Sequence, residues 1–126
     1  MVFGVGVDII EVDRVQDKLT RTPSLKEKLY TRVEISYCES KKFLYQHYAA
    51  RFAAKEAFMK ALGTGWSQGV KFSEIEIHNL ETGQPVIEVS GQAQKICQAQ
   101  GITRFYVSLS HLQTKAVAVV VLEKDD

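Results

Sequence analysis

The sequence predicts an α+β fold: a single domain, residues 1–126, with a mainly antiparallel sheet packed against one long helix and several short ones. Two observations predict it. Helical patterns fill most of the first half of the chain, and alternating strand patterns fill most of the second half. In addition, 126 residues with 45% hydrophobic content suit one domain with one core, and no linker, repeat or low-complexity segment divides the chain.

The first elements follow from local patterns. The stretch "VFGVGV", residues 2–7, alternates apolar residues with glycine and predicts a strand that ends at Asp8. A helix is expected to follow and to end before Pro23, because apolar residues recur at helical spacing at Val12, Val15 and Leu19. Two capping-box patterns, "SLKE" from Ser24 and "TRVE" from Thr31, predict two short helices.

The later elements follow in the same way. A long helix is expected from about residue 43 to residue 62, and Gly63 is its natural end because glycine adopts the left-handed conformation at little cost. Then "FSEIEIHNL" and "VIEVS" predict a hairpin around the turn "ETGQP", and "GQAQKICQAQG" predicts a helix. The segments "TRFYVSLSH" and "KAVAVVVLE" predict two more strands in the sheet that the first strand joins, and the last is apolar on both faces, as a central or interface strand would be.

Composition narrows the class of protein. The net charge of +1 does not favour nucleic-acid binding. The apolar runs are too short to span a bilayer, and the first residues lack a basic leader and a small-residue cleavage site. Cys38 and Cys97 have neither metal-ligand nor redox spacing, so we expect ordinary thiols in helical segments. These features predict a cytoplasmic protein that binds neither nucleic acid nor membrane.

The long helix contains a carboxylate where apolar residues are expected. In "RFAAKEAFMKALGTG", residues 51–65, Glu56 points in the same direction as Phe52, Ala53 and Met59. Only Lys60, one turn later, shares that side, so Glu56 either forms an ion pair with Lys60 or faces another positive charge. Asp8, at the end of the first strand, is a second isolated carboxylate, and it could simply cap the next helix.

Together these two carboxylates suggest a metal and phosphate site. Mg²⁺ takes hard oxygen donors and completes its octahedron with water and substrate phosphate, so Asp8 and Glu56 are its candidate ligands. Lys60 could contact the same phosphate. The "GTG" turn, Gly63 to Gly65, offers backbone N–H groups to an anion, or is only a flexible turn. His111 is a candidate phosphate donor or simply a histidine at a strand end.

A basic stripe lies on the predicted first helix. Arg14, Lys18 and Arg21 share one side of it at helical spacing. Such a stripe is usually a solvated helix face. The alternative is a docking surface for an acidic partner, because opposite potentials steer encounter.

Three segments resemble, in order, the holo-acyl-carrier-protein synthase family of small 4′-phosphopantetheinyl transferases: "GVGVDIIEVDRV", "RFAAKEAFMKALGTG" and "VSLSH…AVAVVVLE". The predicted middle hairpin also resembles that of the family, so the resemblance covers nearly the whole chain. It implies the 4′-phosphopantetheinyl transferase fold and an Mg²⁺-dependent reaction. In that reaction the serine of an apo-acyl carrier protein attacks the β-phosphate of coenzyme A, takes up phosphopantetheine and releases 3′,5′-ADP. The resemblance also implies a homotrimer with sites between subunits.

The resemblance assigns roles to individual residues. It implies that Asp8 and Glu56 bind the metal and that Glu56 and Lys60 are the catalytic residues. The coenzyme A site would be lined by Arg51, Lys60, Gly63, Gly65 and His111. The carrier protein would dock on Arg14, Lys18 and Arg21. A looser match before the long helix implies a role for Glu34.

Several alternatives stay open from sequence alone. Either Glu56 or a metal-bound water could accept the serine proton. The main rival function is a non-catalytic oligomeric module that binds coenzyme A or nucleotides, which would not need both Asp8 and Glu56. A small Mg²⁺-dependent phosphohydrolase is a second rival, but the sequence shows neither a two-metal ligand cluster nor a nucleophile motif.

Overall fold

The computed structural model describes residues 1–63 and 68–125, and every predicted helix and strand is present in it. In chain order the elements are β1 (Val2–Glu11), α1 (Val12–Arg21), α2 (Leu25–Leu29), α3 (Arg32–Glu39), α4 (Leu44–Leu62), the 3₁₀ turn η1 (Phe72–Glu74), β2 (Ile75–Asn79), β3 (Pro85–Val89), α5 (Gly91–Ala99), β4 (Ile102–His111) and β5 (Lys115–Lys124).

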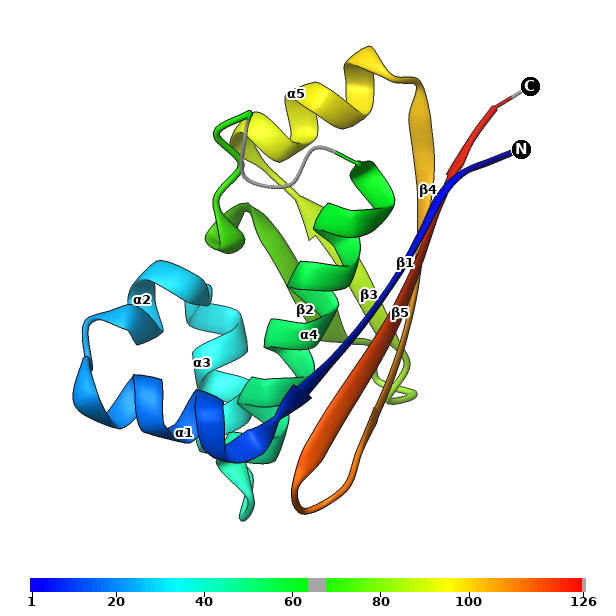
Figure 1. The fold of residues 1–126 in the computed structure, drawn as a ribbon. Helices are drawn as coiled ribbons and strands as arrows, with labels where there is room; N and C mark the ends of the chain where they lie inside the picture. Colours follow the sequence, from blue (N-terminus) through cyan, green and yellow to red (C-terminus); the bar gives the residue numbers. More distant parts are fainter. Residues whose placement is uncertain (64–67, 126) are drawn as a thin grey trace.

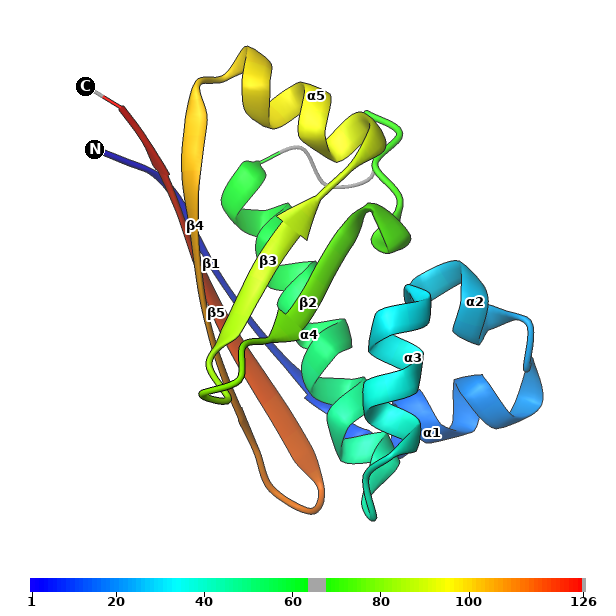
Figure 2. The same cartoon turned by 180° about the vertical axis from the view of Figure 1, so that it is seen from behind.

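The strands form two antiparallel sheets. β5 lies between β1 and β4, as its two apolar faces predicted, and β1 joins this sheet by pairing with β5. The β2–β3 hairpin forms its own two-stranded sheet instead of extending the first one. Figures 1 and 2 show that the hairpin covers a side of α4 next to the one covered by the three-stranded sheet, and β3 lies beside β4. The predicted antiparallel sheet is therefore confirmed, except that the hairpin forms a separate two-stranded sheet that also packs against α4.

The long helix α4 is the centre of the molecule. The three-stranded sheet and the hairpin cover two adjacent sides of it, with α1–α3 grouped near its first turns and α5 beyond its last (Figures 1 and 2). Twelve of its nineteen residues are buried, and they point in every direction around the helix axis. A helix that is buried all round needs cover on more than one side, which the two sheets supply.

Two glycines let β1 and α4 approach closely. A Cβ atom on Gly4 would lie 1.9 Å from the carbonyl oxygen of Ala61, and one on Gly6 would lie 1.9 Å from that of Ala57. Any side chain there would collide with the helix backbone, so only glycine permits this glycine–alanine seam. Residues two apart on a strand share a face, so Asp8 follows Gly4 and Gly6 on the side that faces α4.

The helix ends agree with the predictions except at Ser24. Thr31 Oγ1 accepts a hydrogen bond from the Glu34 N–H at 3.3 Å, and Glu34 Oε1 accepts one from the Thr31 N–H at 2.9 Å, which confirms that capping box. Gly63 ends α4 with a φ of +81°. Ser24 is wrong as a capping residue: its backbone is already helical, and its side chain accepts no cap hydrogen bond within the described chain.

The outer face of the three-stranded sheet is apolar and open to solvent. Val5, Val7 and Ile9 of β1 are 61%, 55% and 64% exposed there. Figures 1 and 2 show that all the helices lie on the opposite side of this sheet, as far as the structure describes the chain. None of the described helices has both the length and the apolar character needed to cross a membrane.

Candidate functional site

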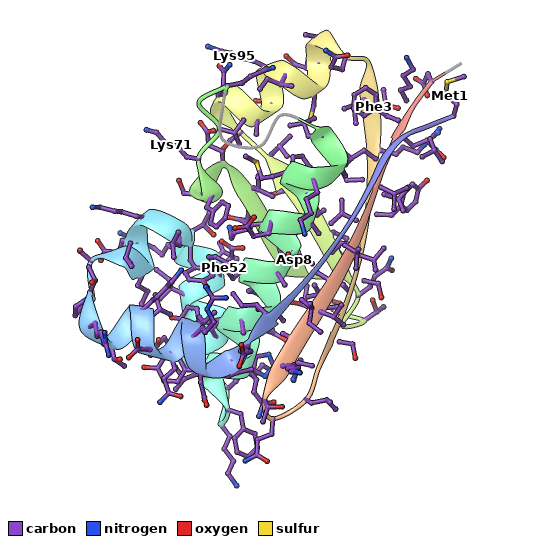
Figure 3. The ribbon with its side chains drawn as sticks, viewed as in Figure 1. Met1, Phe3, Asp8, Phe52, Lys71 and Lys95 are labelled. Carbon is purple, nitrogen blue, oxygen red and sulfur yellow. The ribbon has the colours of Figure 1, made fainter. Side chains whose placement is uncertain are left out.

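An ion pair joins β1 to the last turns of α4. The strand does not end at Asp8 as predicted, because its pairing with β5 continues to Glu11. Lys60 Nζ donates to Asp8 Oδ1 at 2.9 Å and to the carbonyl oxygen of Val7 at 3.1 Å. The Asp8 side chain is 18% exposed and that of Lys60 is 55% exposed, so the pair lies at the edge of the β1–α4 contact. Figure 3 labels Asp8 on β1 beside α4. α1 begins only after Glu11, which occupies its N-cap, so Asp8 does not cap that helix.

Glu56 lies beside this pair in a partly buried position. Burial raises the pKa of Glu56, and the negative charge of Asp8 raises it further, while Lys60 and Lys18 oppose the shift. Among the described residues Glu56 forms no ion pair within 4.0 Å, because Lys60 is bonded to Asp8 instead. The structure therefore brings Asp8, Glu56 and Lys60 together, and it leaves Glu56 with an adjacent negative charge that is only partly compensated.

This arrangement fits a hard divalent cation. Two carboxylates that come from separate elements and raise each other's energy would both be stabilised by a shared positive ion. Their oxygen atoms are the ligands that Mg²⁺ prefers, and a site of one or two carboxylates leaves positions for water and substrate phosphate. The Lys60 ammonium adds a second positive group on the same edge.

The basic stripe on α1 lies next to this site but is not uniform. Lys18 Nζ lies 5.8 Å from the centre of the Phe52 ring, and its charge lowers the pKa of Glu56. Arg14 is exposed, and Arg21 forms an ion pair with Asp17 at 2.9 Å. Lys18 is therefore the member of the stripe that reaches the carboxylates.

Arg51 occupies an interior position in the single chain. Its side chain is only 2% exposed, Nη2 donates to Asn79 Oδ1 at 2.5 Å, and the guanidinium lies 4.0 Å from the centre of the Tyr37 ring. Gly63 follows α4 directly, three residues after Lys60, whereas Gly65 lies outside the described residues. The coenzyme A roles of these three residues stay predictions.

His111 lies apart from the carboxylate pair within one chain. Asp8 pairs with Ala118 of β5, and His111 stands at the end of β4, two strands from β1, which corresponds to about 10 Å at ordinary strand spacing. Its Nδ1 lies 3.0 Å from Gln46 Oε1, and its ring meets the His47 ring at 5.0 Å. Burial, followed by the charges of His111, Arg51 and Lys41, lowers the pKa of His47 to about 4.

A buried ion pair that was not predicted from the sequence lies beside the site. Lys55 Nζ donates to Glu34 Oε1 at 2.8 Å and to the carbonyl oxygens of Phe72 and Ile75, and both charged side chains are 0% exposed. Burial lowers the pKa of Lys55, and the Glu34 carboxylate opposes this. Glu34 Oε2 also accepts the Ile77 N–H at 3.0 Å. The pair thus ties α3, α4 and β2 together and supports the helix that carries Glu56.

A signal for this pair exists in the sequence. α4 is alanine-rich with apolar residues all round, a pattern typical of a buried helix, in which even a lysine lies in the interior. The identity of the partner, Glu34, cannot be derived from spacing, because 21 residues separate it from Lys55.

Known proteins resemble this chain over almost its full length. The model of the 4′-phosphopantetheinyl transferase superfamily matches residues 4–120. The holo-[acyl-carrier-protein] synthase of Syntrophus aciditrophicus is 44% identical over 124 residues, which cover 98% of this chain and 97% of the relative. That of Clostridium acetobutylicum is 45% identical over 123 residues and covers 98% of each chain.

Solved structures agree with these relatives. The Neisseria meningitidis synthase superposes with a TM-score of 0.90 at 32% identity, covering 98% of this chain and 100% of the other. The Bacillus anthracis synthase in complex with CoA (3′,5′-ADP) superposes with a TM-score of 0.82 at 35% identity, covering 99% of each chain. The predicted fold class and the family resemblance are confirmed. The chain belongs to the 4′-phosphopantetheinyl transferase superfamily.

Proposed function

We propose that this protein is a holo-[acyl-carrier-protein] synthase that transfers the 4′-phosphopantetheine group from coenzyme A to a serine of apo-acyl carrier protein. The observation that carries the proposal is the meeting of Asp8, Glu56 and Lys60 where β1 crosses α4. It occurs in a chain similar over its length to proteins named for this activity, one of them solved with CoA.

The chemistry needs a held diphosphate and a free serine oxygen. The serine Oγ forms a bond to the β-phosphorus of coenzyme A, the bond from that phosphorus to the bridging oxygen breaks, and 3′,5′-ADP leaves with that oxygen. Asp8 and Glu56 would hold Mg²⁺, which would offset the diphosphate charge when bound. Lys60 places a further positive charge beside the diphosphate.

The serine proton needs an acceptor at the same edge. Among the described residues of the site, Glu56 is the candidate by position, because its carboxylate lies beside Asp8 and Lys60, which would hold the diphosphate with Mg²⁺. Holding the serine oxygen in line with the leaving oxygen would supply the rest of the acceleration.

Partners and assembly complete the proposal. The acidic carrier would dock on Arg14, Lys18 and Arg21, the last of which would exchange its ion pair with Asp17 for the carrier. The chain would form a homotrimer through the outer face of the three-stranded sheet, because a contiguous apolar face of this kind marks an interaction surface. Val5, Val7 and Ile9 lie on it, together with Tyr106 and Val119. A cytoplasmic location stays a prediction.

Assembly would also explain the placement of the predicted coenzyme A residues. His111 lies two strands from Asp8 in one chain, so a site that uses both would combine two subunits. Light scattering tests this directly: a monomer with full activity would contradict the shared site.

The direct test is modification of a carrier protein. The protein is incubated with apo-acyl carrier protein, coenzyme A and Mg²⁺, and mass spectrometry detects the added phosphopantetheine. Glu56→Gln should lower turnover by about 100-fold or more, because it removes a charge that acts on the reacting diphosphate. Glu27→Gln on α2 is the matched control at an exposed glutamate and should be unchanged. Normal turnover of Glu56→Gln at saturating Mg²⁺ and coenzyme A would refute the role of Glu56.

The same assay separates the rival function. A non-catalytic module would bind coenzyme A and leave the mass of the carrier unchanged. The joint placement of Asp8, Glu56 and Lys60 favours the transferase, because binding alone requires no pair of adjacent carboxylates.

A further inference from the structure

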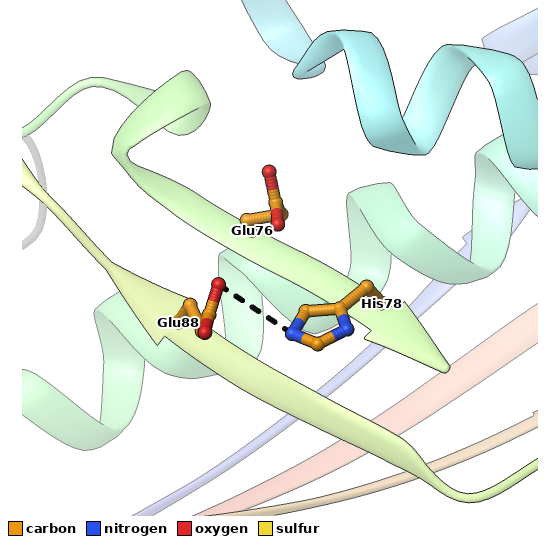
Figure 4. A group of neighbouring side chains, drawn as sticks. All are labelled: Glu76, His78 and Glu88. Atoms are coloured by element: carbon orange, nitrogen blue, oxygen red, sulfur yellow. Dashed lines mark ion pairs between the residues drawn. The ribbon is translucent and has the colours of Figure 1, made fainter. Parts of the chain in front are cut away.

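Away from the Asp8–Glu56 edge, the β2–β3 hairpin presents a second group of possible metal ligands. Glu76 and His78 lie two residues apart on β2, and Glu88 lies on β3 directly opposite Glu76. These three side chains share the outer face of the hairpin, because Ile75, Ile77 and Ile87 of the other face are buried in the core. One ligand atom from each lies within 4.8 Å of the other two (Figure 4).

The two carboxylates of this group have no lysine or arginine partner within the described chain. Two carboxylates directly opposite each other on antiparallel strands repel, and this destabilises a hairpin. In the part of the chain that the structure describes, neither Glu76 nor Glu88 forms an ion pair with a lysine or arginine. The nearby Lys55 ammonium is fully buried and bonded to Glu34, so it is not available to them.

An independent feature is the imidazole nitrogen that faces the carboxylates. His78 Nε2 is buried, although the side chain as a whole is 27% exposed, and it has no hydrogen-bond partner among residues 1–63 and 68–125. It lies 3.5 Å from Glu88 Oε2, which Figure 4 shows as a dashed line. A buried polar atom without a partner is costly, so a group that binds it would stabilise the fold.

The geometry matches one class of cation. In a tetrahedral zinc site with bonds of about 2.1 Å, two ligand atoms lie about 3.4 Å apart. The separation of 3.5 Å between His78 Nε2 and Glu88 Oε2 is close to that value. Glu88 is 70% exposed and Glu76 partly buried, so rotations of their side chains alone can bring the third oxygen into range. Imidazole as a ligand favours zinc and similar transition metals over Mg²⁺.

We propose that Glu76, His78 and Glu88 form a binding site for a divalent transition-metal ion of the zinc class, with water as the fourth ligand. The ion would neutralise the opposed carboxylates and lock β2 to β3. This site is separate from the proposed Mg²⁺ site on β1 and α4, and it does not depend on the transferase function.

Three other places could bind zinc and must be distinguished. The rings of His47 and His111 lie 5.0 Å apart, and Asp8 and Glu56 are carboxylate neighbours. The thiols are weaker candidates, because both are buried and burial raises the pKa of Cys38 to about 12 and that of Cys97 to about 11.

The test is zinc binding to untagged protein that has been stripped with a chelator. Zn²⁺ is titrated in competition with a chromophoric chelator in the presence of excess Mg²⁺, and circular dichroism checks that each variant is folded. We expect one Zn²⁺ per chain. Loss of outer-shell partners alone typically weakens metal sites by about 10- to 100-fold, so His78→Gln and Glu88→Gln, which remove direct ligands, should weaken binding at least tenfold.

Matched controls decide the location. Glu81→Gln in the turn of the same hairpin, and His47→Gln, should bind Zn²⁺ like the unmodified protein. Zn²⁺ should also raise the unfolding temperature of the unmodified protein but not that of His78→Gln. Unchanged binding in His78→Gln, an equal loss in His47→Gln or Glu56→Gln, or no saturable binding would each overturn the proposal. The carrier-modification assay with Mg²⁺ tests the transferase function independently.

Discussion

Replacement of Lys55 by methionine tests the buried ion pair most directly. The change keeps the length and apolar stem of the side chain but removes the ammonium group. Glu34 would then remain 0% exposed, with the N–H groups of Thr31 and Ile77 as donors but no positive charge. The carbonyl oxygens of Phe72 and Ile75 would lose a shared donor as well.

The size of the effect follows from this burial. Removing one partner of a buried pair typically costs about 3–5 kcal/mol, because the other charge is left uncompensated. A domain of this kind has about 5–15 kcal/mol of total stability, so the free energy of unfolding should fall by about a fifth or more. Lys26→Met is the matched control. Lys26 forms an ion pair with Glu39, and the two side chains are 30% and 44% exposed, respectively. Exposed pairs of this kind contribute about 0–1 kcal/mol to the free energy of unfolding.

Urea unfolding followed by circular dichroism measures both variants. A double-mutant cycle with Glu34→Gln isolates the pair, and Lys55→Met with Glu34→Gln should be less destabilised than the sum of the single changes by about 2–3 kcal/mol. A loss below about 1 kcal/mol for Lys55→Met, against the expected 3–5, would refute the reasoning. So would strict additivity in the cycle.

Four further outcomes are expected. Gly6→Ala should cost about 1–3 kcal/mol in urea unfolding, because its Cβ would lie 1.9 Å from the Ala57 oxygen; an unchanged midpoint would show that the seam can open freely. Arg14→Glu should raise KM for the carrier protein and leave KM for coenzyme A nearly constant; a parallel rise would assign the stripe another role. Val7→Glu should lower the assembly mass in light scattering, because it places a charge on the exposed apolar face; an unchanged mass would exclude that face as the interface. The pKa of His47 is about 4 in the folded protein and near 6.5 in the unfolded chain, so the unfolded state binds more protons between these two pH values. The contribution of His47 to the free energy of unfolding should therefore be fully present above pH 6.5 and be lost as the pH falls toward 4. Because the side chain is partly exposed, we expect a loss of about 1 kcal/mol. His47→Gln should flatten that slope, and an unaltered slope would contradict the assignment.

Local patterns were sufficient for the elements but not for their pairing. The end of α4 at Gly63 and the capping box at Thr31 depend on a few adjacent residues, and both are confirmed. Ser24 carries the same capping pattern but fails, because its backbone is already helical one residue before the short α2. No local pattern shows that the hairpin forms a separate sheet, because this depends on how the hairpin packs against α4.

The candidate site shows the same division. Asp8, Glu56 and Lys60 were identified from residue type and family resemblance, and the structure brings them together. Helical spacing did not reveal that Arg51 and Lys55 are buried, because their burial depends on the sheet, the hairpin and the short helices that cover α4 over most of its length. The spacing also could not show that Lys60 prefers Asp8 over Glu56, since Asp8 lies on another element.

The close contact of β1 with α4 helps to fix the separation of the backbone segments that carry Asp8 and Glu56. At Gly4 and Gly6 the distance between strand and helix is set by main-chain atoms, which neither change rotamer nor vary in volume. Rearrangements elsewhere in the interior can therefore be absorbed by side chains without changing the gap that Asp8 and Glu56 span. Because main-chain atoms set this distance, the spacing of the two carboxylates can stay the same when many of the surrounding side chains are substituted.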